Sequence, residues 1–274
     1  MSKRRKFIIA TIILTLGIVA IRYPFLQWRF RVAIYAVVAA LLSFWSLLDP
    51  DLKGVKRITI TSQPVFYAVS AALAYPLLPP IFENFLVWPI SYDTGLILAF
   101  GLRLIYLAIF AVGYYAALLC GNIYNVASIR TIQLLRAAHS VGFILALSST
   151  LLFYLIIASF HLESFINVIL IFTITFPLVL GNLWAVNLSE TIEKRLVTLA
   201  FFIALVIAQV SWAISFWPLT VTVFALFLAA VFYVLVGLSQ YYLSEKLFAT
   251  TIREFIIVSL IIFCFVILST SWSG

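Results

Sequence analysis

The sequence predicts an all-α fold: a polytopic transmembrane helix bundle of about nine spans. The 274-residue chain is 65% hydrophobic and 9% charged, whereas about a quarter of the residues in a soluble globular protein are charged. Its apolar runs approach or exceed the roughly 20 residues that a membrane-crossing helix requires. These runs are unbroken, unlike the alternating segments of about ten residues that form a membrane β-barrel.

The apolar runs follow one another with short gaps. Helices are the expected conformation because lipid offers the backbone no hydrogen-bond partner. The longest gaps, Asp49–Pro64 and Gly121–Arg136, are too short to fold alone, so residues 1–274 are predicted to form a single transmembrane domain with no soluble domain. The expected spans are Phe7–Ile21, Val32–Leu48, Val65–Phe82, Leu96–Cys120, Ala137–Phe160, Phe165–Asn187, Leu196–Phe216, Leu219–Leu243 and Phe255–Trp272.

The first span has a second interpretation. The basic run Lys3–Lys6 followed by a short apolar stretch is also typical of a signal peptide. Gly17–Ala20 is a poor cleavage site, because Ile18 occupies a position that favours a small residue. We therefore expect an uncleaved anchor, while cleavage would leave eight spans with the same orientation.

The third span is bracketed by prolines. Either it is a tilted helix whose outer end unwinds at Pro79 and Pro80, or it is a broken or re-entrant helix that lines a cavity. The tilted helix is favoured, because a re-entrant segment would invert the charges of all later loops. Small residues predict packing faces on other spans, at Ala200, Ala204 and Ala208 and in the pair Ala36 and Ala40.

The basic residues set the orientation. With a cytoplasmic N-terminus, thirteen of the 17 Lys and Arg residues lie inside, three lie outside within Arg22–Arg31, and Arg103 lies within a span. Because cytoplasmic loops carry the excess of Lys and Arg, the N-terminus is predicted inside and the C-terminus outside. Tryptophans are then expected at the outer interface (Trp28, Trp88, Trp217 and Trp272) and at the inner interface (Trp45 and Trp184).

The richest polar segment is predicted on the inner side. Gln133, Arg136 and His139 would share one side of a helix, with Arg130 nearby. They are candidates to bind an anionic head group, such as a lipid phosphate. The alternative is structural and more common: Arg136 would dock on Glu190 or Glu193.

Other polar residues complete a predicted inner vestibule around this segment. They are Asn122, Asn125, Asn182, Asn187, Glu190 and Glu193. Arg103 is the one strong base inside an apolar run. Arg103 either pairs with Asp93, Glu83 or Glu163, or extends its side chain to the lipid head groups.

Several kinds of chemistry lack support in the sequence. No metal site, cofactor or catalytic residue is predicted, and Asp49 and Asp51 are a weak acidic pair beside basic residues. Cys120 and Cys264 would lie at different depths, so no disulfide is expected. The net charge of +8 does not indicate a nucleic-acid partner, since the basic residues flank membrane spans.

Two strings carry a resemblance. The string from Asn122 to His139 and the string Ser215–Pro218 resemble an uncharacterised family of bacterial multi-pass membrane proteins, associated with candidate-phylum bacteria. The resemblance implies a bacterial cytoplasmic (inner) membrane. It implies no activity and transfers no catalytic residue.

Three classes of function follow from these observations. The favoured one is binding or translocation of a lipid-like or amphipathic anionic molecule, with membrane lipids, anionic ones among them, as partners. The second is a non-catalytic assembly or scaffold subunit with a membrane protein partner. The third is an intramembrane lipid-modifying enzyme, which is disfavoured because no acid–base pair is evident.

The orientation makes a direct prediction. A cysteine placed in the segment Glu83–Asp93, in a chain with Cys120 and Cys264 replaced by alanine, should react with a membrane-impermeant maleimide in intact cells. A cysteine at Ser189 should react only after lysis. The opposite result would invert the topology.

Overall fold

The computed structural model describes residues 2–21, 27–48, 54–77, 92–128 and 133–270, except for the side chains of residues 55 and 92–99. Within these ranges the chain forms nine α-helices, one 3-10 turn and no strand, so the all-α prediction is confirmed. Each expected span overlaps one helix. The elements are α1 (Lys3–Ile21), α2 (Trp28–Leu47), α3 (Val55–Ala74), η1 (Tyr75–Leu77), α5 (Tyr92–Ala127), α6 (Leu135–Ser159), α7 (Ser164–Asn187), α8 (Lys194–Ile214), α9 (Val221–Leu243) and α10 (Ala249–Ser269).

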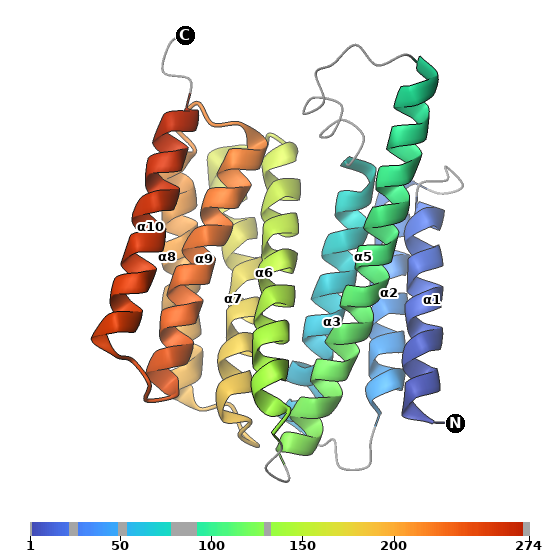
Figure 1. Ribbon diagram of the computed structural model, residues 1–274, viewed down its shortest axis with the longest axis horizontal. Helices are drawn as coiled ribbons and strands as arrows, with labels where there is room; N and C mark the ends of the chain where they lie inside the picture. The colour runs from blue at the N-terminus through green and yellow to red at the C-terminus, as the bar shows by residue number, and fades with distance from the viewer. Residues whose placement is uncertain (1, 22–26, 49–53, 78–91, 129–132, 271–274) are drawn as a thin grey trace.

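Successive helices run in opposite directions (Figure 1). The helices α1, α3, α6, α8 and α10 begin at one end of the bundle, where α2, α5, α7 and α9 finish. We call this the basic end, because its described residues include Lys3, Arg4, Arg5, Lys6, Lys56, Arg57, Arg136, Lys194, Arg195, Lys246 and Arg253. The start of α1 and the finish of α10 therefore lie at opposite ends. The assignment of the basic end to the cytoplasm stays a prediction.

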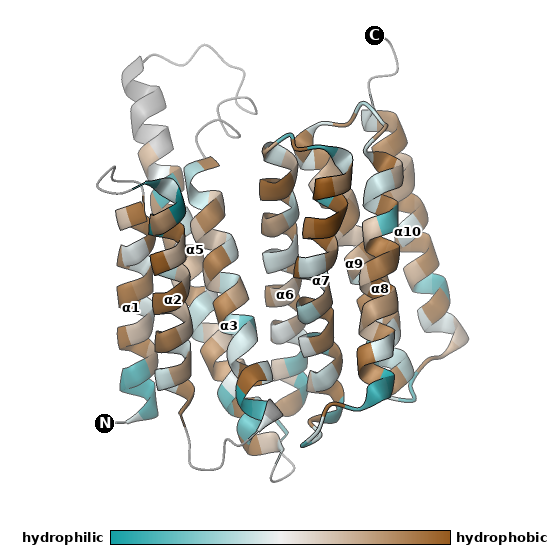
Figure 2. Cartoon of the chain, turned by 180° about the vertical axis from the view of Figure 1, so that it is seen from behind, coloured by the Kyte–Doolittle hydropathy of each residue, from teal (hydrophilic) through white to brown (hydrophobic). Residues whose placement is uncertain are grey.

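Seven of the described helices are long and apolar enough to cross a membrane: α2, the part of α5 from Phe100 to Ala127, and α6 to α10. The helices α1 and α3 are more polar, since α1 begins with four basic residues and α3 carries Lys56, Arg57 and Gln63. Hydrophobic residues, coloured brown, run along most of the helices (Figure 2). Many large apolar side chains are exposed, among them Leu268, Phe216 and Val112 at 85%, 74% and 72% exposure. Such a surface suits a lipid environment and is unusual in a water-soluble monomer.

The helices form two sub-bundles. The N-terminal sub-bundle (α1, α2, α3 and α5) buries the stacked rings of Tyr67, Phe110 and Tyr114, with neighbouring ring centroids 5.9 Å apart. The C-terminal sub-bundle (α6 to α9) buries Tyr154, whose hydroxyl lies 2.6 Å from Thr175 Oγ1. α10 packs on α9 at the edge, and α3 contacts both sub-bundles through α6 and α7.

Small residues allow close helix packing, although not always at the predicted positions. Ala200, Ala204 and Ala208 of α8 are buried as predicted. On α2 the predicted pair is wrong, because Ala36 is only half buried and Ala40 is exposed. The buried face of α2 instead contains Tyr35, Ala39 and Ser43; these repeat every four residues, offset from the predicted pair by one position.

The third predicted span is displaced along the sequence. α3 runs from Val55 to Ala74 rather than from Val65 to Phe82, and it continues as a helix through Pro64. Its 20 residues extend roughly 30 Å, so α3 is neither broken nor re-entrant over this range. Pro79 and Pro80 lie outside the described residues. The earlier start places Lys56 and Arg57, which were predicted in a loop, on the first turn of the helix.

Polar side chains join the two sub-bundles near the basic end. Gln63 Nε2 of α3 donates a 2.5 Å hydrogen bond to the carbonyl of Gly142, and the Tyr124 hydroxyl of α5 donates a 2.9 Å bond to the carbonyl of Ala138. Gly142 is required here, because a Cβ atom would lie 2.4 Å from the Tyr124 hydroxyl oxygen. We call Gln63, Tyr124, Ala138, His139 and Gly142 the inter-bundle seam.

This close approach predicts a non-additive pair of substitutions. Gly142→Ala should lower the free energy of unfolding by about 1–3 kcal/mol, the usual cost of overpacking. Tyr124→Phe should cost about 1 kcal/mol for the lost hydrogen bond. The double variant should cost less than the sum, because the remaining ring carbon lies 3.5 Å from the new Cβ.

Unfolding by heat or by SDS in detergent micelles measures these differences. The control is Gly101→Ala, where nothing lies within 4 Å of the added Cβ and only helix propensity changes. Strictly additive costs at Gly142 and Tyr124 would contradict the described contact.

Candidate functional site

The predicted anion-binding residues occupy different environments. Arg130 lies outside the described residues. Gln133 lies in the turn before α6, which begins at Leu135, so its predicted place on a shared helical face is wrong. Arg136 is on the first turn of α6, and the side chains of both Gln133 and Arg136 are exposed. These two residues are therefore accessible at the basic end.

His139 belongs to the seam. Its Nε2 lies 2.7 Å from the carbonyl oxygen of Ala185 in α7, and its ring centroid lies 5.7 Å from that of Tyr124. The side chain is half buried between α5, α6 and α7. His139 is thus a contact between helices, and it does not share the exposure of Arg136.

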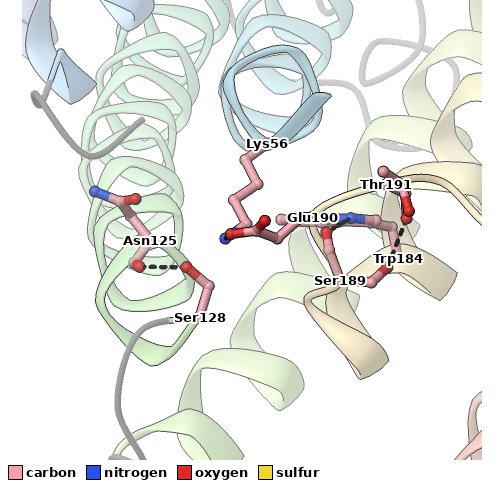
Figure 3. Close-up of polar contacts among 7 residues, drawn as sticks. All are labelled: Lys56, Asn125, Ser128, Trp184, Ser189, Glu190 and Thr191. Atoms are coloured by element: carbon pink, nitrogen blue, oxygen red, sulfur yellow. Dashed lines mark hydrogen bonds and ion pairs between the residues drawn. The ribbon is translucent and has the colours of Figure 1, made fainter. Parts of the chain in front are cut away.

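An ion pair connects α3 with the segment after α7 (Figure 3). Lys56 Nζ lies 3.3 Å from Glu190 Oε1, with 8% of the lysine side chain and 89% of the glutamate side chain exposed. Among the described residues no carboxylate lies within 4.0 Å of the Arg136 guanidinium, so the predicted contact of Arg136 with Glu190 or Glu193 is wrong. The reason is the early start of α3, which brings Lys56 to Glu190.

The segment that carries Glu190 is held by Trp184. The indole Nε1 donates a 3.0 Å hydrogen bond to the carbonyl of Ser189, and the Ser189 hydroxyl donates a 2.8 Å bond to the carbonyl of Thr191. Leu188 adopts a left-handed conformation with φ of 48°. Trp184 is only 1% exposed. Its predicted place at the lipid interface is therefore wrong, and its function is to fix this turn.

Two of the predicted asparagines lie on α5. The helix continues to Ala127, beyond the predicted end at Cys120, and so it includes Asn122 and Asn125. Asn122 Oδ1 accepts a 3.1 Å hydrogen bond from Lys3 Nζ of α1. Asn125 is buried, and its carbonyl accepts a 2.7 Å bond from the Ser128 hydroxyl (Figure 3). Both residues support helix ends at the basic end.

The remaining predicted polar residues lie at the end of α7. Asn182 is buried, and its Nδ2 donates a 2.7 Å bond to the carbonyl of Leu178. The Asn182 carbonyl accepts a 3.4 Å bond from Gln240 Nε2 of α9. Asn187 and Glu193 are exposed on either side of the turn. These contacts tie α7 to α9 and leave Asn187 and Glu193 accessible.

A small cavity with a few polar side chains in its lining lies beside the seam. It is lined by residues of α3, α5 and α7, including Gln63, Tyr124 and Asn182, and its free volume is about 10 Å³. That volume suits about one water molecule. Of the residues predicted to form a vestibule, only Asn182 lines this cavity, and it is too small for a lipid head group.

Arg103 lies near the other end of α5. Its side chain is half buried. The predicted partners Glu83 and Asp93 are outside the described side chains, and Glu163 makes no ion pair with Arg103. Pairing with Glu83 or Asp93 and extension to the lipid head groups both stay predictions.

The described residues contain no group of three or more His, Cys, Asp or Glu side chains that could hold a metal ion. Asp49 and Asp51 lie outside those residues. Cys120 is buried and Cys264 is exposed, and both are free. The residues that sequence reasoning missed are Lys56, Gln63 and Tyr124. Recognising that a span tolerates Pro64 would have placed the first two on a helix.

This architecture defines the class of the protein: a multi-pass helical bundle of the membrane-spanning type, with polar contacts between helices at the seam and most of its described cations at the basic end. Residues 149–269 match a family described as "Protein of unknown function (DUF5656)". The match begins within α6 and covers α7 to α10, and it includes Ser215–Pro218 but not the string from Asn122 to His139. Over this segment the resemblance to an uncharacterised family is confirmed, while a bacterial origin stays a prediction. No curated protein and no solved structure matches the chain.

The ion pair between Lys56 and Glu190 predicts an asymmetric effect. Glu190→Gln should destabilise the protein by about 1–2 kcal/mol, because it leaves a buried ammonium without that partner. Glu193→Gln, at an exposed position of the same segment, should be neutral within about 0.5 kcal/mol. Adding Lys56→Met to Glu190→Gln should restore most of the loss. Equal effects of the two glutamine variants in a detergent melting assay would contradict the role of this pair.

Proposed function

We propose that the protein binds a lipid-like or amphipathic anionic molecule at its basic end, with Arg136 and Gln133 in contact with the anionic group. The supporting observation is Arg136 itself. Its exposed guanidinium sits at the start of a membrane-crossing helix, with no described carboxylate within 4.0 Å. A guanidinium there can bind a phosphate through two parallel hydrogen bonds. Arg130, close in sequence, would add a second cation.

Helix polarity supports an anionic ligand. Helices α1, α3, α6, α8 and α10 begin at the basic end, and none has an acidic residue in its first turn, although Glu193 is the N-cap residue of α8. A helix N-terminus carries a partial positive charge that an acidic side chain normally offsets. Here the basic side chains add to that charge, so anions are attracted to this end.

Binding fits the geometry better than translocation. The cavity at the seam has about 10 Å³ of free volume, and its neighbours Gln63, Tyr124 and His139 are engaged with backbone carbonyls of adjacent helices. In this proposal His139 does not touch the ligand, and it holds α6 against α7 so that Arg136 keeps its position.

One observation favours the alternative of a scaffold subunit. The turn 188–193 is held by Trp184 and Ser189, and it exposes Glu190 and Glu193 at an end that is otherwise rich in cations. A rigid, exposed acidic turn suits docking of a basic protein segment. We further propose, from the resemblance and the charge asymmetry, that the protein resides in a bacterial cytoplasmic membrane with the basic end inside.

Native mass spectrometry of the gently purified protein separates the two proposals. We expect a co-purifying anionic lipid whose occupancy falls about tenfold in Arg136→Gln, the change that one charge-assisted hydrogen bond supplies. Lys194→Gln, an exposed cation at the start of α8, is the matched control and should retain the lipid. A stoichiometric protein partner that is lost on Glu193→Gln would favour the scaffold, and equal lipid occupancy in all variants would overturn the binding proposal.

A further inference from the structure

A groove runs between α9 and α10 on the outside of the bundle. It encloses about 370 Å³ and is lined by apolar side chains, including Ala230 and Val234 of α9 and Ile256, Leu260 and Phe263 of α10. This volume is within the range of about 300–1,000 Å³ typical of sites that bind small molecules. The one hydroxyl in the lining belongs to Ser259, and it donates to the carbonyl of Phe255 at 2.8 Å. The groove therefore presents a hydrocarbon-like surface.

Aromatic contacts hold the two helices of the groove together. The Phe255 ring packs against Tyr233 and Tyr241, at centroid distances of 5.4 and 6.0 Å, and fastens α10 to α9. Gly237 permits this contact, since a Cβ there would lie 2.7 Å from the Phe255 ring. At the end away from the basic end, Trp217 lies 6.4 Å from Phe263, the last residue of α10 in the groove lining.

The groove is much shorter than a membrane-crossing helix. Its lining on α10 runs from Ile256 to Phe263, or about 10 Å along a helix that rises 1.5 Å per residue, and Arg253 lies one turn before Ile256. The hydrocarbon core is roughly 30 Å thick. A partner helix would cross both leaflets and would need a groove along the whole of α10, whereas an acyl chain needs only a short segment.

A cation lies at the basic end of the groove. Arg253 precedes Ile256 and Leu260 by three and seven residues, so the three share one side of α10. Glu254 lies on the opposite side of the helix from Ile256. Among the described residues no carboxylate is within 4.0 Å of the Arg253 guanidinium. Lys246 and Glu245 in the preceding turn are the other charges near this end, and both are exposed.

We propose that this groove is a lipid-binding site. It holds one acyl chain of an anionic glycerophospholipid from the leaflet at the basic end, with the lipid phosphate at Arg253. The site is separate from Arg136 and does not depend on the function proposed above. It lies entirely within the segment 149–269 that matches the uncharacterised family.

Photo-crosslinking in lipid nanodiscs tests the site. The probes are phosphatidylglycerol and phosphatidylcholine, each with a diazirine in one acyl chain, and the labelled peptides are read by mass spectrometry. Labelling near Val112, which is 72% exposed on α5, provides the reference for ordinary contact with bulk lipid. We expect the anionic probe to label Ile256–Phe263 about tenfold more than the zwitterionic probe does, relative to that reference.

Paired variants separate charge from shape. Arg253→Gln should remove the anionic preference, whereas Glu254→Gln on the opposite side of α10 should keep it. Ala230→Phe should fill the groove and abolish its excess labelling with both probes. Ile261→Phe, at a position 63% exposed to lipid, should leave the labelling unchanged. Arg136→Gln should also leave it unchanged, which distinguishes this site from the proposed site on α6.

Two results would overturn the proposal. One is labelling of the groove no stronger than that near Val112 for either probe, which would mean contact with bulk lipid only. The other is an anionic preference that survives Arg253→Gln, because Arg253 is the residue assigned to the phosphate. Neither result requires a variant that disturbs folding.

Discussion

The structure depends on one constraint: a polar group inside the hydrocarbon layer must find its hydrogen-bond partner within the bundle. Hydroxyls such as those of Ser149 and Thr150 bond to carbonyls one turn earlier in their own helix. Tyrosines and His139 reach further, to carbonyls of neighbouring helices. Because a helix carbonyl can accept a second hydrogen bond, these side chains fix helix contacts without needing a polar partner side chain. The bundle is therefore held by polar bonds at a few points and by apolar packing elsewhere.

The same constraint divides the polar side chains into those that hold helices together and those that can bind other molecules. Gln63, Tyr124 and His139 are occupied at the seam, and the cavity beside them suits about one water. Among the described residues, the polar groups at the basic end that remain available to other molecules include its exposed charges, such as Arg136 and Arg253. Helices that begin there supply positive partial charge, while α2, α5, α7 and α9 finish there without a basic residue in the last turn. Near the end of α5, the side chain of Asn122 accepts a hydrogen bond from Lys3 of α1. Local charge thus varies across this end, and Arg136 and Arg253 lie where no described carboxylate offsets them.

Hydropathy predicted an all-helical chain of about nine spans, and seven of the described helices are long and apolar enough to cross a membrane. It did not predict the helix ends or their inner faces. It measures transfer from water, so it cannot tell a side chain that faces lipid from one that faces another helix. Trp184 and Ala40 were assigned to the wrong environments for this reason. It also ended spans at polar residues, although α3 and α5 bury theirs against neighbours. The candidate site was mispredicted for the same reason. Glu190 forms its ion pair with Lys56 and not with Arg136, and that pairing depends on where α3 begins. The alternation of loops with and without basic residues depends only on the order of the loops, so these errors do not affect it.

The position of α3 between the two sub-bundles has a consequence for how the chain is made. α3 is too polar to rank among the membrane-crossing helices by composition, and the partner of its Lys56 is 134 residues further along the chain. At synthesis rates of about 5–20 residues per second, Glu190 emerges on the order of ten seconds after Lys56. Before α6 is made, α3 can contact only α1, α2 and α5. During synthesis α3 is therefore first held in the membrane by the N-terminal sub-bundle. Its contacts with the C-terminal sub-bundle form after α6 and α7 have been made.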